Sequence, residues 1–435
     1  MDIIYRPSKT IGLVLLYIFA TFFLSNAAHS IELNLSSLTL SKHIDKATSR
    51  EILSNINQLD GYNSRDYVDL FEQVSAHARS GNDEAIGLLG VLYFYGIGTT
   101  QDVDKAVELL SNAHANKDLG GVISGLLAIA YYKGISVEQD YDVAFDLFYS
   151  SIDYSVNNYI FKGAYKYLAE MYFKGYGVTT DYSKAYLFIV KSLSNNPKEA
   201  KSKNMLASLY EQGLGLKSNY KLAHELYNQV ITDNNEPQEV AWAYYSLSRF
   251  YKEGLEVTVD HDTARKYVEK AAELGNILAL HEMYESYKYG IGVEKNESLS
   301  LNYLFKLADI DDPKAINMLG EYYASNDNLI EAYKWYRRGA LLNDSQSQYQ
   351  LGIQYFEGNG AKQDYEKAMH WLQKSAEQGY HESYYILGKM HYEGLGCRKS
   401  KGIGLRYLDQ AVKSNDENAI AYLNGIKAKL KQNQN

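Results

Sequence analysis

Residues 345–379 combine two amphipathic helical patterns with a glycine turn between them. In each half, apolar or small residues recur three and four positions apart, as they do on the buried face of a helix. Gly358 and Gly360 fall between the halves, where glycine marks a turn. The two halves are anchored by Leu351, Gly352 and Tyr355 and by Ala368, Trp371 and Ala376. This stretch therefore predicts a helical hairpin.

The same pattern recurs along most of the chain. Nine copies align on the residue equivalent to Leu351, at roughly the 34 to 40 residue spacing of two-helix repeats. In most copies a small residue follows directly, and an aromatic residue follows four positions later. The aligned positions are Leu89, Leu127, Leu168, Leu206, Leu247, Met283, Leu319, Leu351 and Leu387. The chain is expected to stack hairpins in a row, each touching only its neighbours.

A glycine stands seven positions after the aligned residue in eight copies, where it suits a left-handed helix end. Six positions further stands a residue whose side-chain oxygen can cap the next helix. The glycines are Gly96, Gly134, Gly175, Gly213, Gly254, Gly290, Gly358 and Gly394. The expected caps are Asp102, Asp140, Asp181, Asn219, Asp260, Asn296, Asp364 and Ser400. Each turn is thus bounded by a helix stop and a helix start.

Three copies depart from this pattern. Between Leu319 and Ala332 four residues are missing relative to the other copies, so a tighter connection is expected there. In two other turns the second glycine is replaced, by Ser136 and by Glu256. Because glycine adopts conformations that other residues avoid, these two turns are expected to differ in shape.

The eight longer copies resemble the Sel1-like repeat, and the shortened copy resembles the related tetratricopeptide repeat. The resemblance covers residues 81–423 and rests on the leucine, the glycine turn and the cap. It implies an all-α fold, an α–α superhelix or solenoid of about nine Sel1-like hairpins. It also implies a protein-binding scaffold, because such repeats present one helix of each hairpin on a common concave face.

Outside the repeats, the chain divides into short segments. Residues 1–27 have basic residues before an apolar run and small residues after it, which predicts a signal peptide cleaved after Ala27; an uncleaved signal anchor is the alternative. Residues 28–63 are interpreted as a linker. The array spans residues 64–423 and begins with a capping half-repeat at residues 64–81, and residues 424–435 form a polar C-terminal tail.

The composition restricts the kind of partner and the cellular location that can be expected. With a formal net charge of -9, the chain is a poor ligand for nucleic acid, so a protein or peptide partner is expected. Cys397 is the one cysteine, so no intramolecular disulfide can form. Exported eukaryotic chains of this size commonly carry disulfides, so a bacterial protein of the periplasm or the extracellular space is expected, with membrane contact only if the leader stays uncleaved.

The search for catalytic and metal-binding motifs yields weak candidates. His224, His281 and His381 each precede a glutamate, but none has the second histidine four positions on that a zinc helix needs. Ser218 and Lys221 match the Ser-x-x-Lys pattern without its partner motifs. Neither a metal nor a cofactor nor a catalytic residue is predicted, and Cys397 has no histidine or cysteine beside it in the sequence.

The resemblance to tetratricopeptide repeats places four positions of each first helix on the concave face: two before the leucine and two, five and six after it. An aromatic groove with interspersed cations suits a peptide ligand. The candidate binding residues are Phe94, Tyr95, Tyr132, Lys133, Phe173, Lys174, Tyr245, Arg249, Lys252, Lys288, Tyr289, Tyr349, Phe356, Tyr385 and Tyr392. The alternative for the aromatic residues five positions after the leucine is packing between neighbouring hairpins.

The sequence therefore predicts an exported, non-catalytic scaffold for protein–protein interaction, in bacterial envelope assembly or in contact with a host. Two other functions stay open. One is a cell-wall-directed hydrolase, a β-lactamase-like Sel1 protein, which would depend on Ser218 and Lys221. The other is a membrane-tethered regulator held by an uncleaved leader.

Overall fold

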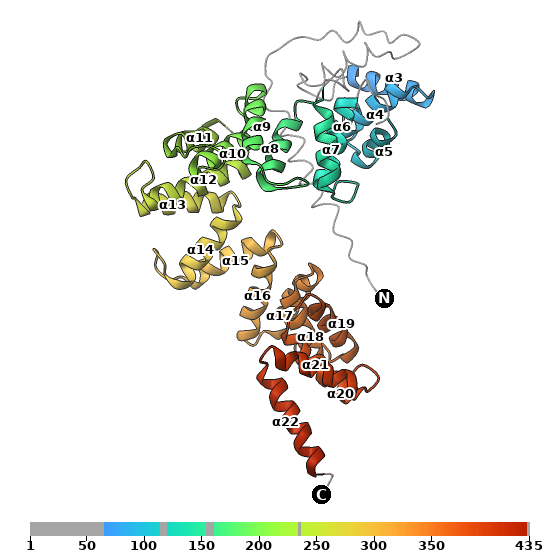
Figure 1. Ribbon diagram of the computed structural model, residues 1–435, viewed down its shortest axis with the longest axis vertical. Helices are drawn as coiled ribbons and strands as arrows, with labels where there is room; N and C mark the ends of the chain where they lie inside the picture. Colours follow the sequence, from blue (N-terminus) through green and yellow to red (C-terminus); the bar gives the residue numbers. More distant parts are fainter. Residues whose placement is uncertain (1–64, 114–119, 154–160, 234–235, 433–435) are drawn as a thin grey trace. The chain divides into compact units, whose positions relative to one another are not determined.

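The computed structural model describes residues 65–113, 120–153, 161–233 and 236–432, and every regular element in these ranges is a helix. The chain divides into two compact units, residues 1–264 and 265–435, with the division inside α13 (His261–Glu273). Figure 1 shows the run of short helices in each unit. The predicted signal peptide and linker lie outside the described residues. No helix in the described ranges is long and apolar enough to span a membrane.

The helices alternate between first and second members of hairpins. The first helices are α4 (Asp83–Tyr95), α6 (Gly120–Lys133), α8 (Ala164–Lys174), α10 (Ala200–Gln212), α12 (Pro237–Glu253), α14 (Ile277–Tyr289), α16 (Pro313–Ser325), α18 (Ser345–Glu357) and α20 (Glu382–Glu393). The second helices are α5 (Val103–Ala113), α7 (Tyr141–Ser151), α9 (Tyr182–Asn195), α11 (Tyr220–Asp233), α13, α15 (Glu297–Asp309), α17 (Leu329–Leu341), α19 (Tyr365–Glu377) and α21 (Lys401–Lys413).

Within each unit, a hairpin packs on the next one. The pairs α4–α5, α6–α7, α8–α9 and α10–α11 are hairpins of the N-terminal unit, and α14–α15 through α20–α21 are hairpins of the C-terminal unit. Second helices within a unit also contact the first helix that follows them, as α7 contacts α8 and α17 contacts α18. The predicted fold class, an all-α solenoid of helical hairpins, is confirmed.

One helix flanks the hairpins at each end. α3 (Arg65–Arg79) packs on α4, where the capping half-repeat was expected. α22 (Glu417–Gln432) packs on α21, so the helix continues through most of the segment interpreted as a polar tail.

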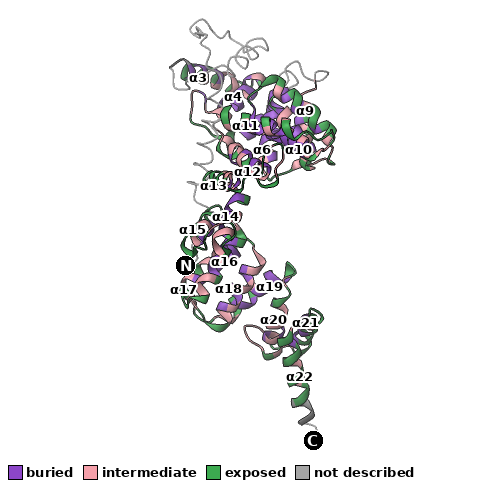
Figure 2. Cartoon of the chain, turned by 90° about the vertical axis from the view of Figure 1, so that its left-hand side faces the viewer, coloured by how far each residue is buried: buried purple, intermediate pink, exposed green. Residues whose placement is uncertain are grey.

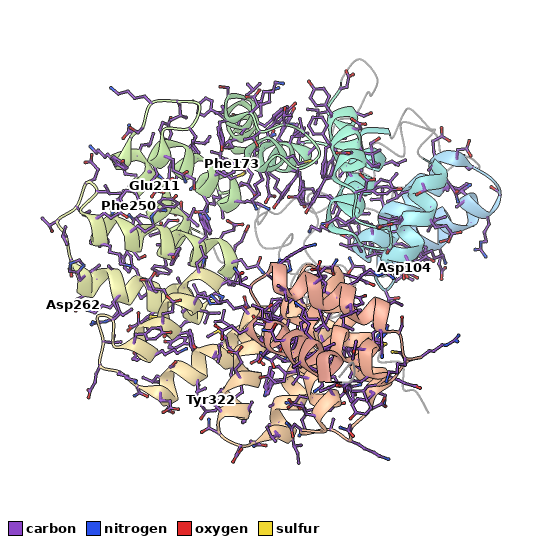
Figure 3. All side chains as sticks on the ribbon, turned by 60° about the horizontal axis from the view of Figure 1, so that its bottom comes forward. Asp104, Phe173, Glu211, Phe250, Asp262 and Tyr322 are labelled. Atoms are coloured by element: carbon purple, nitrogen blue, oxygen red, sulfur yellow. The ribbon has the colours of Figure 1, made fainter. Side chains whose placement is uncertain are left out.

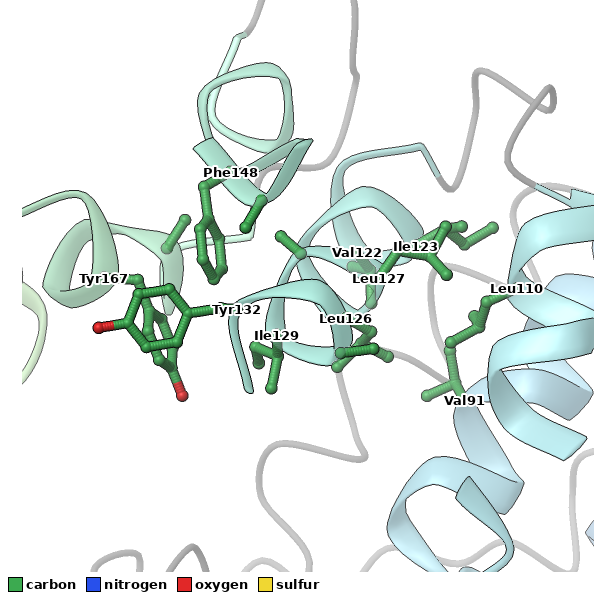
Figure 4. Packing of buried hydrophobic residues seen from close by; sticks show 14 of the residues in the cluster. Val91, Leu110, Val122, Ile123, Leu126, Leu127, Ile129, Tyr132, Phe148 and Tyr167 are labelled. Carbon is green, nitrogen blue, oxygen red and sulfur yellow. The ribbon is translucent and has the colours of Figure 1, made fainter. Parts of the chain in front are cut away.

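The contact between the two helices of a hairpin explains the small residue after the leucine. A Cβ on Gly352 would lie 2.7 Å from Leu372 Cγ, and one on Gly388 would lie 2.7 Å from Leu408 Cγ, closer than carbon atoms can pack. Leu351 and Leu387 beside them are fully buried. Figure 2 shows buried residues gathered where the helices face each other, and Figure 4 shows Val91, Leu110 and Leu126 meeting in this way in the N-terminal unit.

The turns follow the predicted chemistry. All eight glycines that end a first helix have a left-handed φ, from 65° at Gly134 to 82° at Gly394. All eight predicted caps accept a backbone N–H of the next helix, as Asp181 Oδ1 does from Lys184 at 2.9 Å. The expectation of a different shape for two turns was wrong. Ser136 and Glu256 adopt φ values of 63° and 58°, in the same left-handed region as the glycines they replace.

The second glycine of most turns has another role, because it lies against the preceding helix. A Cβ on Gly177 would collide with the carbonyl group of Tyr141 at the start of α7. A Cβ on Gly98, Gly215, Gly360 or Gly396 would likewise come within 3.0 Å of Tyr67, Tyr182, Leu329 or Tyr365. Gly292 is the exception among the described turns, because an added Cβ there would meet no atom within 4 Å. These turns therefore join successive hairpins as well as the two helices of one hairpin.

This contact predicts that Gly177→Ala destabilises the N-terminal unit by roughly 3 kcal/mol, because both backbone strain and a backbone clash result. Gly379→Ala is the matched control: its φ of 85° is also left-handed, but no described atom lies within 4 Å of the added Cβ. The control should cost only about 1 kcal/mol. Urea denaturation followed by circular dichroism measures both, and equal effects would contradict the packing role of Gly177.

Candidate functional site

The predicted binding residues all lie on first helices, but they do not form a single site. Phe94, Tyr95, Tyr132, Lys133, Phe173, Lys174, Tyr245, Arg249 and Lys252 belong to the N-terminal unit, and Lys288, Tyr289, Tyr349, Phe356, Tyr385 and Tyr392 belong to the C-terminal unit. Their exposure also differs widely, from 9 % for Tyr132 to 63 % for Tyr289. Each unit therefore has its own first-helix face, defined as the surface formed by these positions.

The aromatic residues five positions after the leucine pack against their neighbours. The Tyr132 ring lies 5.3 Å from the rings of Tyr141 and Tyr167, the first on its own hairpin and the second on the next. The Phe173 ring lies 5.8 Å from Tyr182, and the Phe356 ring 5.6 Å from Tyr365. Of these contacts, only that of Tyr132 with Tyr167 joins neighbouring hairpins; Phe173 and Phe356 contact the second helix of their own hairpin and keep part of their surface exposed.

A buried carboxylate organises the N-terminal first-helix face. Glu170 on α8 is 3 % exposed, and its carboxylate pairs with Lys174 Nζ at 2.9 Å and with Lys201 Nζ on α10. Tyr132 on α6 also interacts electrostatically with Glu170. Three successive first helices thus meet at one carboxylate.

A second carboxylate continues this arrangement along α10 and α12. Glu211 is 5 % exposed, and it pairs with Arg249 at 2.9 Å and accepts from the Tyr227 hydroxyl at 3.0 Å. Figure 3 shows Glu211 near Phe250, the neighbour of Arg249 in the sequence. Asn204 Nδ2 donates to Glu239 Oε2 at 2.7 Å, and Lys166 pairs with Glu199 at 3.5 Å. We call these interhelical pairs the ion ladder.

The sequence analysis missed the acidic and amide members of this ladder, although its own rule locates them. Glu170 stands two positions after Leu168, Asn204 two positions before Leu206, and Glu211 five positions after it. Only aromatic and cationic residues were selected at these positions. The sequence does contain a signal for them, because an acidic residue at a first-helix position of one repeat is followed by a basic residue on the first helix of the next repeat.

Burial and the charges of the ladder shift the pKa of Glu170 and of two residues near the ladder, Glu236 and Lys133. Burial acts to raise the pKa of Glu170, but Lys201 and Lys174 outweigh burial and the pKa is lowered. Burial, with Glu199 beside it, raises the pKa of Glu236 to about 7. Burial, with Lys166 and Lys201 nearby, lowers the pKa of Lys133 to about 8. Acidic and basic groups therefore lie close together on this face, and the protonation of Glu236 and Lys133 changes near neutral pH.

The catalytic and metal candidates have local structural partners. His281 Nε2 lies 3.2 Å from Asp312 Oδ2, and Asn228 Nδ2 lies 3.3 Å from His224 Nδ1. Ser218 and Lys221 are both exposed, and Asn219 between them caps α11. In the ranges that the structure describes, no three histidine, cysteine or acidic side chains are grouped as metal ligands.

Cys397 has a neighbour that the sequence did not reveal. Its Sγ lies 3.4 Å from His391 Nδ1, across the turn between α20 and α21. Burial raises the pKa of the thiol, which favours the protonated form over a reactive thiolate.

The ladder predicts that Glu170→Gln loosens α8 and α10, because Lys174 and Lys201 lose their carboxylate. The two lysine side chains are 46 % and 33 % exposed, so solvent screening reduces the effect to about 1–3 kcal/mol of local opening free energy. Hydrogen exchange of the α8 and α10 amides measures it. Asp409→Asn, which breaks the exposed pair with Lys413, is the control and should leave the exchange unchanged.

Glu236 predicts a pH dependence of stability. Its pKa is about 7 in the folded chain against 4.5 ordinarily, so the folded state binds the proton more tightly, and stability is lost as the pH rises through this interval. Glu236→Gln removes the loss. The urea midpoint of the variant should therefore gain on the wild type between about pH 4 and about pH 8. Glu253→Gln, exposed at the other end of α12, is the control, and a constant difference for both variants would contradict the prediction.

Comparison with known proteins identifies the repeat. The model of the Sel1 repeat family matches nine segments of the chain. These are residues 83–113, 125–153, 163–194, 200–230, 243–276, 278–312, 313–344, 345–380 and 381–416. Each segment contains the two helices of one hairpin, or most of them.

Individual relatives are more distant. The chain is 30% identical to chitin synthase regulator SKT5 of Saccharomyces cerevisiae over 208 residues, which are 45% of this chain and 29% of that protein. It thus matches less than a third of that relative's length.

Among solved structures, the chain is similar to c5321, a protective antigen of uropathogenic Escherichia coli with an SLR fold. The identity is 22%, the match covers 93% of this chain and 92% of that one, and the TM-score is 0.42. A Sel1 repeat protein from Oxalobacter formigenes is also 22% identical, over 66% of this chain and 96% of that one, with a TM-score of 0.30. The family model spans most of the chain, and the chain therefore belongs to the Sel1 repeat family.

Proposed function

We propose that this chain is a non-catalytic scaffold that holds a protein partner on its first-helix faces. A Sel1 repeat array is suited to protein–protein interaction, because it presents many side chains on a regular surface without needing a catalytic cleft. The name of the similar yeast protein, a chitin synthase regulator, agrees with a role in regulation rather than in catalysis.

The observation that carries this proposal is the direct contact between successive first helices. α8 contacts α10, and α10 contacts α12, so their exposed positions form one continuous surface in the N-terminal unit. Tyr245 and Arg249 lie half-buried on that surface, and Lys252 is exposed. Aromatic and arginine side chains held in this way contribute much of the affinity of protein interfaces.

We further propose that the scaffold is exported and acts in the bacterial envelope or outside the cell. The support is the sequence alone: Arg6 and Lys9 before the apolar residues 11–24, small residues up to Ala27, and a single cysteine. N-terminal sequencing of the protein purified from its native membrane and periplasmic fractions separates cleavage after Ala27 from a retained anchor.

The scaffold proposal predicts which positions cross-link to a partner. A photoreactive amino acid at Lys252 on α12 or at Tyr289 on α14 should yield adducts in envelope extract, because both are exposed on first helices. Leu187 on α9 and Ile330 on α17 are the controls: they are 49% and 64% exposed on second helices. Adducts of equal yield from the controls would contradict docking on the first-helix faces.

A further inference from the structure

The first-helix face of the C-terminal unit carries carboxylates without cationic partners. Helices α16, α18 and α20 contain four glutamates against two lysines, and an aspartate caps α18 and another caps α22. In the described part of the chain, none of these six carboxylates has a lysine or arginine nitrogen within 4.0 Å. They are Glu321, Glu357, Glu382, Glu393, Asp344 and Asp416.

The contrast with the N-terminal unit is direct. There, Glu170, Glu199 and Glu211 lie at equivalent helices, and each is paired with a lysine or arginine of the same face. Three acids of the N-terminal face are thus paired with cations of that face, whereas the six carboxylates of the C-terminal unit have no lysine or arginine nitrogen within 4.0 Å.

The opposite side of the same hairpins has the opposite charge. The second helices α17, α19 and α21 carry eight lysines and arginines against four acids. The excess of acidic residues is therefore confined to the first helices, and the second helices of the same unit have an excess of basic residues.

Tyrosine rings lie among these carboxylates. The Tyr349 and Tyr380 rings are 5.2 Å apart and half-buried. Glu382 acts electrostatically on both of them, and Asp416 acts on Tyr349 and on Tyr385 of α20. We define the acidic tyrosine face as Tyr349, Tyr380, Tyr385, Glu321, Glu382 and Asp416.

Two further contacts show what this face can bind. Lys389 Nζ lies 5.5 Å from the Phe356 ring centroid, so a cation already rests on an aromatic ring of the same helices. Asn317 on α16 is 3% exposed, and its Nδ2 donates to Glu321 Oε1 at 2.8 Å. Its Oδ1 has no hydrogen-bond donor among the described residues. This buried acceptor lies beside Glu321 and lacks the donor that buried oxygens ordinarily have.

We propose that the acidic tyrosine face binds a lysine- or arginine-rich segment of a partner protein. This inference deepens the proposed function and rests on docking at the first-helix faces. Guanidinium and ammonium groups fit both features, because they pair with carboxylates and stack on tyrosine rings. A basic segment also supplies N–H donors to the exposed carboxylate of Glu321. Anionic partners would be repelled.

The test measures binding of the full chain to a fluorescent peptide of alternating arginine and glycine, by fluorescence anisotropy. The double variant Glu321→Gln, Glu382→Gln removes two charges while keeping the shape of both side chains. We expect the dissociation constant to rise on the order of tenfold, and added salt to weaken binding by the wild type. Glu366→Gln, Glu377→Gln on α19 is the matched control, since both positions are exposed on a second helix, and it should bind like the wild type.

A citrulline peptide and the cross-linking experiment described above complete the test. A peptide with citrulline in place of arginine keeps the shape and loses the charge, so it should bind much more weakly. Equal binding of the citrulline peptide, or equal loss in the two double variants, would overturn the inference. If the arginine peptide fails while Lys252 and Tyr289 still cross-link to a partner, the basic-ligand inference is wrong and the scaffold proposal stands. If those positions fail to cross-link as well, both are wrong.

Discussion

The close contact between the two helices of each hairpin is the constraint on which the structure depends. A leucine and a small residue on the first helix pack on the second, and a side chain as small as a methyl group is too large at Gly352 and Gly388. This contact fixes the spacing of the hairpin, and the left-handed glycine and the cap fix its turn. Because the second glycine also touches the preceding hairpin, the same turn positions one repeat on the next. First helices therefore stand on one side and second helices on the other.

The two units use the resulting first-helix face differently. In the N-terminal unit, buried carboxylates pair with cations from the following repeat, as Glu170 does with Lys201 and Glu211 with Arg249. Breaking such a pair is costly, so the ladder favours one register of α8, α10 and α12 over others. In the C-terminal unit, the equivalent surface has tyrosines and carboxylates that have no lysine or arginine nitrogen within 4.0 Å. The first-helix face of the N-terminal unit thus stabilises the packing of its helices, and that of the C-terminal unit has negative charges with which a ligand can pair.

Much of the fold could be predicted from the sequence, because the stops, caps and small residues are local and repeat at a fixed spacing. Positions such as Asp181 and Gly175 did what the pattern predicts. Ser136 and Glu256 did not, since the packing of the hairpin imposes a left-handed φ even where glycine is absent. The ion ladder was missed because its partners lie on different repeats, and the pairing of Cys397 with His391 was missed because it depends on how one turn folds back. Which candidate residues bind a partner cannot be deduced from their position in the repeat. Tyr132 and Lys252 both stand five positions after the aligned leucine, yet Tyr132 is buried and Lys252 is exposed.

The central claim is that recognition takes place on the first helices. Hydrogen exchange of the full chain with and without the bound arginine peptide tests it most directly. The account predicts that added protection concentrates in α16, α18 and α20, with α17, α19 and α21 unchanged. Protection that appears on the second helices, or evenly along both sides, would contradict it.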